Sequence, residues 1–213
     1  MSMTSLPDDD YRGGDAEDDR RAIIRLVNDW VVFRDAGYWD RFAGVWHHDG
    51  RMHATWFQGP ATEFIAASRA GRKAGVNILH TICGISVDIA GDRAIAQTKM
   101  VINQRADVHG VRCDVECFGR FYDFLERRDG RWGIVLRQPI YEKDRILSVV
   151  PGAAIQLDES ILQGFPVGYQ HLAYVQTQVG MTVVRDMPGL DGDAVEELYR
   201  RGASWLNGGP SGG

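Results

Sequence analysis

The chain is poor in cysteine and has neither a long apolar run nor an apolar leader. Its three cysteines among 213 residues are an odd number, which fits reduced thiols better than a disulfide framework. No run of about 18 apolar residues occurs, which argues against a membrane-spanning helix. Residues 1–20 are acidic and lack the apolar stretch of a secretory signal. We therefore expect a cytoplasmic protein without a membrane partner.

A basic excess and the common nucleotide and hydrolase motifs are also missing. The formal net charge is −5, so the chain offers no general attraction for nucleic acid or for an anionic membrane. The sequence contains no Gly-x-Gly-x-x-Gly, no P-loop and no Gly-x-Ser-x-Gly, which leaves no basis for a nucleotide-binding or serine-hydrolase function. What is present, 44% hydrophobic and 25% charged residues, is typical of a globular domain.

Composition divides the chain into four parts. Residues 1–16 read as a disordered acidic arm, 17–150 as the main domain, 151–206 as a helical extension, and 207–213 as a flexible tail. The extension has too few core residues to fold alone, so we expect it to pack over the domain or to embrace a neighbouring subunit. In the first case it would close the mouth of the domain with some of these side chains: Phe165, Tyr169, His171 and Tyr174.

Helical patterns come first in the main domain. Apolar residues at helical spacing predict a helix over residues 17–35, with acidic side chains suited to its positive N-terminal end. A second helix is predicted over residues 39–46, followed by a short strand over 51–57. Pro60 marks the start of a third helix over residues 61–72.

Four long strand patterns follow, joined by tight-turn signals. The predicted strands run over residues 78–89, 94–103, 111–125 and 132–141. Strands of this length need bending to stay compact. Gly84 and Gly119 are the expected bend points.

A carboxylate and an imidazole stand out in this pattern. Asp35 continues the apolar stripe of the first helix, where burying a charge is unfavourable unless a partner receives it. His80 lies in the first long strand, on the same face as Ile78 and Ile82. A carboxylate that orients an imidazole in an apolar cavity is a general-base device. The alternatives are an Asp35 that turns to solvent and a His80 that bonds to a backbone carbonyl.

Two residues of the last strand are further catalytic candidates. Arg137 and Tyr141 share one face by alternation, opposite Trp132, Ile134, Leu136 and Gln138. Arg137 is a candidate for holding an oxyanion or phenolate, and Tyr141 for donating a proton or hydrogen bond. The alternative is a cross-strand pair of Arg137 with Asp114 or Glu116.

Five residues are candidate substrate contacts. Lys99 lies unusually in mid-strand, where it forms either a salt bridge or a Schiff base. Aromatic residues of the N-terminal part serve mainly as core, but a fraction lining a cavity would favour a flat aromatic ligand. Charged and aromatic residues that alternate opposite the cysteines in residues 111–125 also fit a half-solvated sheet face. The candidates are Tyr38, Trp56, Lys99, Glu116 and Phe118.

Clustered histidines and cysteines raise the question of a metal. His47 and His48 are adjacent, so on a helix they point about 100° apart and cannot easily bind one ion. Cys113 and Cys117 lie on a predicted strand and not in the tight turn that zinc pairs prefer. We expect no metal site here or at His53.

The order of elements and four short motifs resemble one protein family. The motifs are residues 33–40 (Phe-Arg-Asp-Ala-Gly-Tyr-Trp-Asp), 78–81 (Ile-Leu-His-Thr), 91–94 (Gly-Asp-Arg-Ala) and 129–134 (Asp-Gly-Arg-Trp-Gly-Ile). Together they resemble the SnoaL-like branch of the nuclear transport factor 2-like superfamily, over about residues 17–145. The resemblance implies an α+β fold, a cone-shaped and strongly bent antiparallel sheet wrapped around N-terminal helices, here with a C-terminal helical extension.

The resemblance also implies a kind of chemistry. Members such as scytalone dehydratase, hexachlorocyclohexane dehydrochlorinase, polyketide cyclases and lyases that release formaldehyde from aromatic dimers work without a cofactor in the cone. Their dehydrochlorinase-like Asp–His base matches Asp35 and His80. Other relatives are binding or assembly modules. In this fold the outer face of the sheet commonly packs against a second copy of the chain, so the resemblance implies a homodimer or homotrimer.

The sequence thus predicts a cofactor-free lyase acting on a hydrophobic, preferably aromatic, small molecule. His80 would be the general base and Asp35 would hold its tautomer, with loss of water, halide or formaldehyde as outcomes that begin alike. Two alternatives stay open. One is an isomerase or cyclase that uses the same pair, and the other is a ligand-binding or oxygenase small-subunit-like module.

Overall fold

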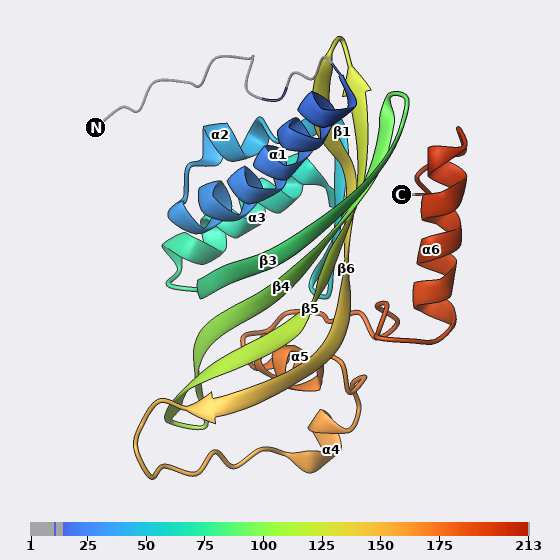
Figure 1. The fold of residues 1–213 in the computed structure, drawn as a ribbon. Helices are drawn as coiled ribbons and strands as arrows, with labels where there is room; N and C mark the ends of the chain where they lie inside the picture. The colour runs from blue at the N-terminus through green and yellow to red at the C-terminus, as the bar shows by residue number, and fades with distance from the viewer. Residues whose placement is uncertain (1–10, 12–14, 213) are drawn as a thin grey trace.

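The structure is a computed structural model that describes Tyr11 and residues 15–212. Three helices, α1 (Ala16–Ala36), α2 (Trp39–Ala43) and α3 (Ala61–Lys73), lie together against one face of a long curved sheet (Figure 1). We call this face of the sheet the inner face. The predicted acidic arm falls mostly outside the described residues.

The sheet has six strands in the order β2-β1-β6-β5-β4-β3. Neighbours pair antiparallel except β1 and β6, which are parallel. The prediction of an α+β fold with a bent sheet of long antiparallel strands is confirmed. The first and last strands, β1 and β6, add one parallel pair that was not predicted. The strands are β1 (Trp46–Ala54), β2 (Phe57–Pro60), β3 (Asn77–Ala90), β4 (Arg93–Val108), β5 (Val111–Arg128) and β6 (Arg131–Ser148).

Helix α1 has clear start and stop signals. The Asp15 side chain accepts hydrogen bonds from the backbone N–H groups of Glu17 and Asp18, and Gly37 ends the helix at φ 78°. The prediction for this helix is confirmed. Helix α2 is shorter than predicted, because the chain turns after Gly44 and Trp46 already begins β1.

Two glycines bend the long strands as predicted. Gly84 has φ 70° and lies where the β3–β4 pairing slips between Cys83 and Ile85. At Gly119 the pairing with β6 shifts, and a Cβ atom would lie only 2.0 Å from the Ile140 carbonyl oxygen. Both bends keep strands of up to 18 residues within a compact shape.

A further irregularity overturns one prediction about β6. Ile134 pairs with Leu125 and Leu136 with Phe124, so Val135 is an extra residue in the ladder. The bulge reverses the alternation, so Ile134 belongs to the inner core whereas Leu136 packs with the residues of the opposite, outer face. The predicted common face for Trp132, Ile134 and Leu136 is therefore wrong.

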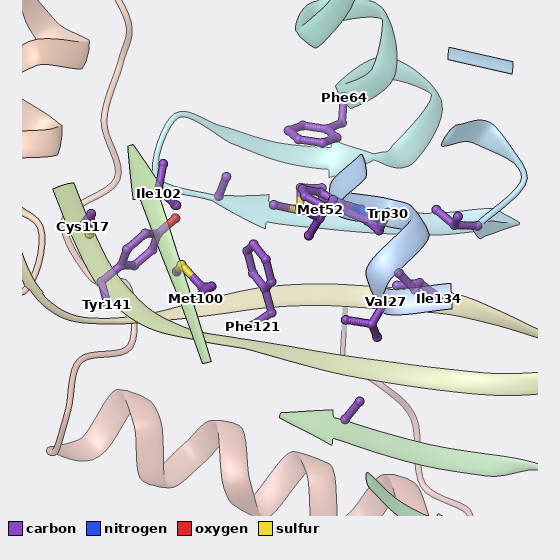
Figure 2. Close-up of a cluster of buried hydrophobic side chains, with 14 of the residues drawn as sticks. Val27, Trp30, Met52, Phe64, Met100, Ile102, Cys117, Phe121, Ile134 and Tyr141 are labelled. Carbon is purple, nitrogen blue, oxygen red and sulfur yellow. The ribbon is translucent and has the colours of Figure 1, made fainter. Parts of the chain in front are cut away.

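The inner core lies between the sheet and the three helices. Figure 2 shows the Phe121 ring of β5 pointing toward Trp30 of α1 and Met52 of β1, with Phe64 of α3 beyond them. Trp30 is 1% exposed, and its ring lies 5.4 Å from that of Phe121 and 6.3 Å from that of Phe64. Aromatic packing of this density fills most of the inner face.

The C-terminal extension packs on both faces of the sheet. It contains α4 (Glu159–Leu162), α5 (Gln170–Gln178) and α6 (Asp193–Leu206). The ring centroid of Tyr169, just before α5, lies 5.1 Å from that of Tyr141 of β6, so α5 covers one end of the inner face. Helix α6 lies on the outer face (Figure 1), where Trp205 packs against Phe124. The extension therefore packs on the domain, and α6 occupies part of the face through which we expected a homodimer or homotrimer to form.

Gly202→Ala is expected to test the docking of α6. Alanine normally stabilises a helix relative to glycine by about 0.5–1 kcal/mol. Here the new Cβ would lie 1.9 Å from the buried Tyr122 hydroxyl oxygen, so we expect a loss of about 1–3 kcal/mol from overpacking. Chemical denaturation measures this change, with exposed Ala203→Ser as the control. A stabilised Gly202→Ala protein would show that α6 does not pack on the sheet.

No helix in the described part of the chain is long and apolar enough to cross a membrane.

Candidate active site

Asp35 and His80 meet as predicted. Asp35 stands at the end of α1, and its Oδ1 atom lies 2.8 Å from His80 Nδ1. Its Oδ2 atom accepts a hydrogen bond of 2.6 Å from the His80 backbone N–H. The side chains are 11% and 7% exposed. Two contacts to one residue fix both the position of the strand and the orientation of the ring.

The electrostatic setting favours a carboxylate beside a neutral imidazole. Burial lowers the pKa of His80, the Asp35 hydrogen bond opposes this, and the Arg34 and Arg137 cations lower it further. For Asp35, burial acts to raise the pKa, but the hydrogen bonds from His80 and the nearby Arg34 charge outweigh it, so the pKa lies below its usual value. The Nδ1–H group then donates to Asp35, and Nε2 carries the free lone pair.

The imidazole lies among aromatic rings. The Trp30 ring stands edge-on at 5.4 Å from the His80 ring, and the Phe121 ring lies 5.9 Å away. Among the hydrogen bonds of the described residues, none reaches His80 Nε2. A basic nitrogen without a partner in an apolar setting is able to accept a proton from a bound molecule.

Two neighbouring spaces lie beside the Asp35–His80 pair. The outer one, which we call the vestibule, has a volume of about 430 Å³ and is lined by Asp35 and parts of α3 and β3. The inner chamber, of about 30 Å³, is lined by His80, Phe121 and Tyr141. Five residues line both spaces, and we call the boundary that they form the constriction: Arg34, Trp56, Ile78, Gln104 and Gln176.

The ligand-sized space is therefore not where we predicted it. The inner chamber holds about one water molecule, because Trp30, Phe64, Phe121 and Leu172 of α5 fill the inner face. The vestibule falls in the size range of about 300–1,000 Å³ that small-molecule sites show. The prediction of a ligand-sized cavity around His80 is therefore wrong. The space of that size is the vestibule, on the other side of the constriction.

Of the other predicted site residues, Trp56 and Tyr141 line this system. Trp56 belongs to the constriction. Tyr141 lies in the chamber wall, where burial raises the pKa of its hydroxyl, so the group is a hydrogen-bond donor at neutral pH. Thr55 contacts that hydroxyl and donates a 2.8 Å hydrogen bond to Gln176.

Arg137 lies behind the chamber and lines neither space. Its Nε and Nη2 atoms donate to Asp123 at 2.6 and 2.7 Å, and both side chains are fully buried. The guanidinium is also packed between the rings of Trp30 and Phe121, 4.2 and 4.1 Å from their centroids. The Arg137 Nη1 atom is buried without a hydrogen-bond partner, so the oxyanion role stays a prediction. The predicted alternative partners, Asp114 and Glu116, are wrong, because the β5–β6 register places Arg137 opposite Asp123 and those two residues opposite Leu147 and Arg145.

Four predicted substrate contacts lie away from the site. Tyr38 is 38% exposed and packs on Phe33. Lys99 is exposed on β4, and no described carboxylate pairs with it. Glu116 pairs with Arg145 at 2.7 Å, and the Phe118 ring lies under that arginine and Lys143. These strand residues alternate with the buried Cys113, Val115 and Cys117, so they lie on the solvated face that was the alternative interpretation.

Three residues of the constriction were not predicted from the sequence. Arg34 directly precedes Asp35, but a charged residue in the last turn of a helix normally reads as solvated. Gln104 and Gln176 are each 3% exposed, and a buried amide gives no signal in a sequence. Gln176 comes from α5, more than 70 positions after Gln104.

The structure places the histidines and cysteines that were considered as metal ligands on strands. His47 and His48 lie on strand β1 and not on a helix. His47 Nε2 lies 2.8 Å from the Glu126 carbonyl oxygen, and Cys113 and Cys117 are buried free thiols. Within the described residues, no group of three or more histidine, cysteine or acidic side chains is arranged to hold a metal ion.

The sequence profile of the SnoaL-like domain matches residues 15–138, more than half of the chain. The chain belongs to the SnoaL-like family. This confirms the resemblance that the four motifs predicted, and the matched segment contains both Asp35 and His80. The two hairpin motifs, 91–94 and 129–134, fall in it as well.

SnoaL-like relatives share more than the core domain. Pea pathogenicity protein 2 of Fusarium vanettenii is 37% identical over 201 residues, which cover 89% of this chain and 86% of that protein. An uncharacterised protein of Emericella nidulans is 35% identical over 206 residues, covering 89% and 87%. Because 89% of the chain is matched, the similarity continues past residue 150 into the extension.

Solved structures share the SnoaL-like fold at low identity. A hexachlorocyclohexane dehydrochlorinase (LinA, type 2) superposes with a TM-score of 0.54 at 16% identity, covering 65% of this chain and 95% of that one. A protein from Kribbella flavida gives 0.52 at 21% identity, covering 59% and 91%. Both are matched almost in full, so the present chain carries a substantial segment that they lack.

Proposed function

We propose that this SnoaL-like protein is a cofactor-independent lyase that removes a proton from a small hydrophobic, preferably aromatic, molecule. The observation that carries the proposal is the doubly bonded Asp35–His80 pair at the inner end of a vestibule of about 430 Å³. A dehydrochlorinase has the same fold, and an elimination of that kind requires a base held as His80 is held.

The reaction begins at His80 Nε2. This nitrogen takes a proton from a carbon or hydroxyl of the substrate, and Asp35 stabilises the imidazolium that forms. In an elimination, the electron pair of the C–H bond becomes a C=C bond as the leaving group departs, either as halide or as hydroxide that takes the proton back from the imidazolium and leaves as water. In a retro-aldol cleavage, the electron pair of the O–H bond becomes the C=O bond of formaldehyde, and the pair of the broken C–C bond stays on the other fragment as a carbanion, which the imidazolium protonates.

The substrate ring occupies the vestibule and the reacting atom passes the constriction. The inner chamber has room for a single small group beside Nε2. Tyr141 donates a hydrogen bond to the oxygen or halide on which negative charge develops. Trp56 lies at the passage and contacts the flat face of an aromatic substrate.

Product analysis tests the proposal. Aromatic compounds with a hydroxyl or halide next to an acidic C–H bond are incubated with the wild-type protein and with His80→Ala, and products are identified by mass spectrometry. An eliminated or cleaved product from the wild type alone supports a lyase. A product of unchanged mass supports the isomerase or cyclase. Binding without turnover supports the non-catalytic module, and equal turnover by both proteins removes His80 from the mechanism.

The pH profile of kcat/KM is expected to be flat above pH 6.5 and to fall on the acid side. The base is active when neutral, and the pKa of His80 lies below its usual 6.5 because it is buried near Arg34 and Arg137. The midpoint of the acid limb is therefore expected below 6.5, as measured with a substrate that does not ionise in this range. A midpoint above 6.5 would show that the base is another group or that Asp35 dominates the titration.

A further inference from the structure

We propose that the substrate of this site carries a carboxylate, which Arg34 binds at the constriction between the vestibule and the inner chamber. The inference rests on the proposed function for the role of His80, but binding is argued from the cavity alone. It names a substrate class, an aromatic acid, that neither the dyad nor the family implies.

Arg34 is a buried cation with unused hydrogen-bond donors. Its side chain is 11% exposed, and its Nε atom is buried without a partner. Its Nη1 atom reaches Asp35 Oδ1 at 3.2 Å and the Ile78 carbonyl oxygen at 3.4 Å, both long for charged hydrogen bonds. A guanidinium has five N–H donors in a planar fork that matches a carboxylate. A ligand carboxylate would satisfy the donors that the protein leaves open.

The charge around the vestibule is unbalanced in the same direction. Its lining contains three charged side chains, the cations Arg34 and Arg72 and the anion Asp35. The Arg72 guanidinium also binds the Asp35 backbone carbonyl. Asp35 is already engaged by His80 through both carboxylate oxygens. One positive charge is left over, which a singly charged anion would neutralise.

Two buried amides stand beside Arg34 in the constriction. Thr55 donates to Gln176 Oε1 at 2.8 Å, and no hydrogen bond from Gln176 Nε2 occurs among the described residues. Gln104 is 3% exposed and lines both spaces, and no hydrogen bond of its side chain occurs among the described residues. An arginine and two amides together form a donor-rich passage, which suits an acceptor such as a carboxylate.

The geometry also orients the substrate. Arg34 and Asp35 are neighbours at the end of α1, and Asp35 contacts His80. A carboxylate on Arg34 therefore places the adjoining carbon atoms near the entrance to the chamber that His80 lines. Proton removal next to or conjugated with a carboxylate is then the favoured chemistry, with the ring in the vestibule.

Calorimetric titration with inert ligands tests the proposal. The probes are 2-naphthoate and the neutral 2-naphthylmethanol, which share one ring system. We expect the wild-type protein to bind the acid about 10- to 100-fold tighter, the range expected for a hydrogen bond to a charged group. Arg34→Gln is expected to lose this preference while its affinity for the alcohol stays nearly the same.

The matched control is Arg69→Gln. Arg69 lies on the same helix as Arg72 but is exposed and lines neither space, so its removal changes the net charge alone and should keep the preference. If Arg34→Gln does not fold, Arg34→Lys replaces it, because lysine keeps the charge but lacks the planar fork of donors. This variant is expected to bind 2-naphthoate more weakly and 2-naphthylmethanol with unchanged affinity. Equal affinity of the wild type for the two ligands overturns the proposal, whatever the variants do.

The test separates this proposal from the proposed function. His80→Ala is expected to keep the preference for 2-naphthoate, because Arg34 and not the imidazole binds the acid. A wild-type preference without turnover of any acid would leave the carboxylate site standing and remove the lyase. Turnover of neutral substrates by a wild-type protein that does not prefer acids would support the lyase and overturn the carboxylate site.

Discussion

His80→Ala is expected to lower kcat by about 100- to 10,000-fold, the usual contribution of a positioned base. The ring is 7% exposed and bonded to Asp35, so no other described side chain takes its place at the inner chamber. The chamber also contains Tyr141, but burial raises the pKa of that hydroxyl, so it does not act as the base. Steady-state kinetics on a substrate found by product analysis measures the loss.

Asp35→Asn separates orientation from proton transfer. The asparagine side chain is close in shape, but its amide nitrogen donates where the carboxylate accepted. If that nitrogen faces His80 Nδ1, the ring proton moves to Nε2, and the base lone pair no longer faces the substrate. We expect a loss in kcat similar to that of His80→Ala, with KM changed less.

His171→Ala is the matched control for both variants. His171 Nδ1 also lies 2.7 Å from a buried carboxylate, Asp144, which accepts a second hydrogen bond from the Leu172 N–H. This second pair lines neither the vestibule nor the inner chamber. Its loss is expected to leave kcat nearly unchanged. A decrease as large as that of His80→Ala would place the chemistry elsewhere.

Arg137→Met is expected to destabilise the protein by about 3–5 kcal/mol. The substitution leaves Asp123 fully buried without the two hydrogen bonds that compensate its charge. Burial already raises the pKa of Asp123, with Arg137 opposing the shift, so without the arginine the acid takes up a proton or the fold opens. Chemical denaturation with far-UV circular dichroism measures the free energy of unfolding.

Two comparisons identify the cause of that loss. Arg112→Met removes an exposed arginine that pairs with Asp107 in the same bidentate way, and it is expected to change the stability little. The double variant Asp123→Leu with Arg137→Met removes both charges and should recover much of the lost stability. A single variant as stable as the wild type would mean that the pair is not buried as described.

Local patterns in the sequence predicted much of this protein. Helical spacing and the acidic side chains near its start placed the first helix, and alternation with turn signals placed the four long strands. Each strand continues beyond its predicted end, most of all β6, which runs to Ser148 and not to residue 141. Gly84 and Gly119 were identified as bends. Asp35 and His80 were paired because a carboxylate on an apolar helix face needs a partner.

The predictions that failed depend on contacts between distant segments. The register of β5 with β6 places Arg137 opposite Asp123, whereas Asp114 and Glu116 lie far along the same strand, opposite Leu147 and Arg145. The bulge at Val135 turns Leu136 to the outer face, and a bulge is set by how two strands twist and pair. The parallel β1–β6 pair and the packing of α6 on the outer face depend equally on distant parts of the chain.

The sequence by itself therefore determined the first helix, the order of the long strands and the pairing of Asp35 with His80, because periodicity and burial act within a few residues. Only the tertiary structure decided where the ligand-sized space lies and which donors face it. The constriction brings together side chains from α1, β4 and α5, namely Arg34, Gln104 and Gln176. Because other side chains fill the inner face, the ligand-sized space is the vestibule and not the chamber that His80 lines. Such convergence arises from packing among segments far apart in the chain, which no local pattern records.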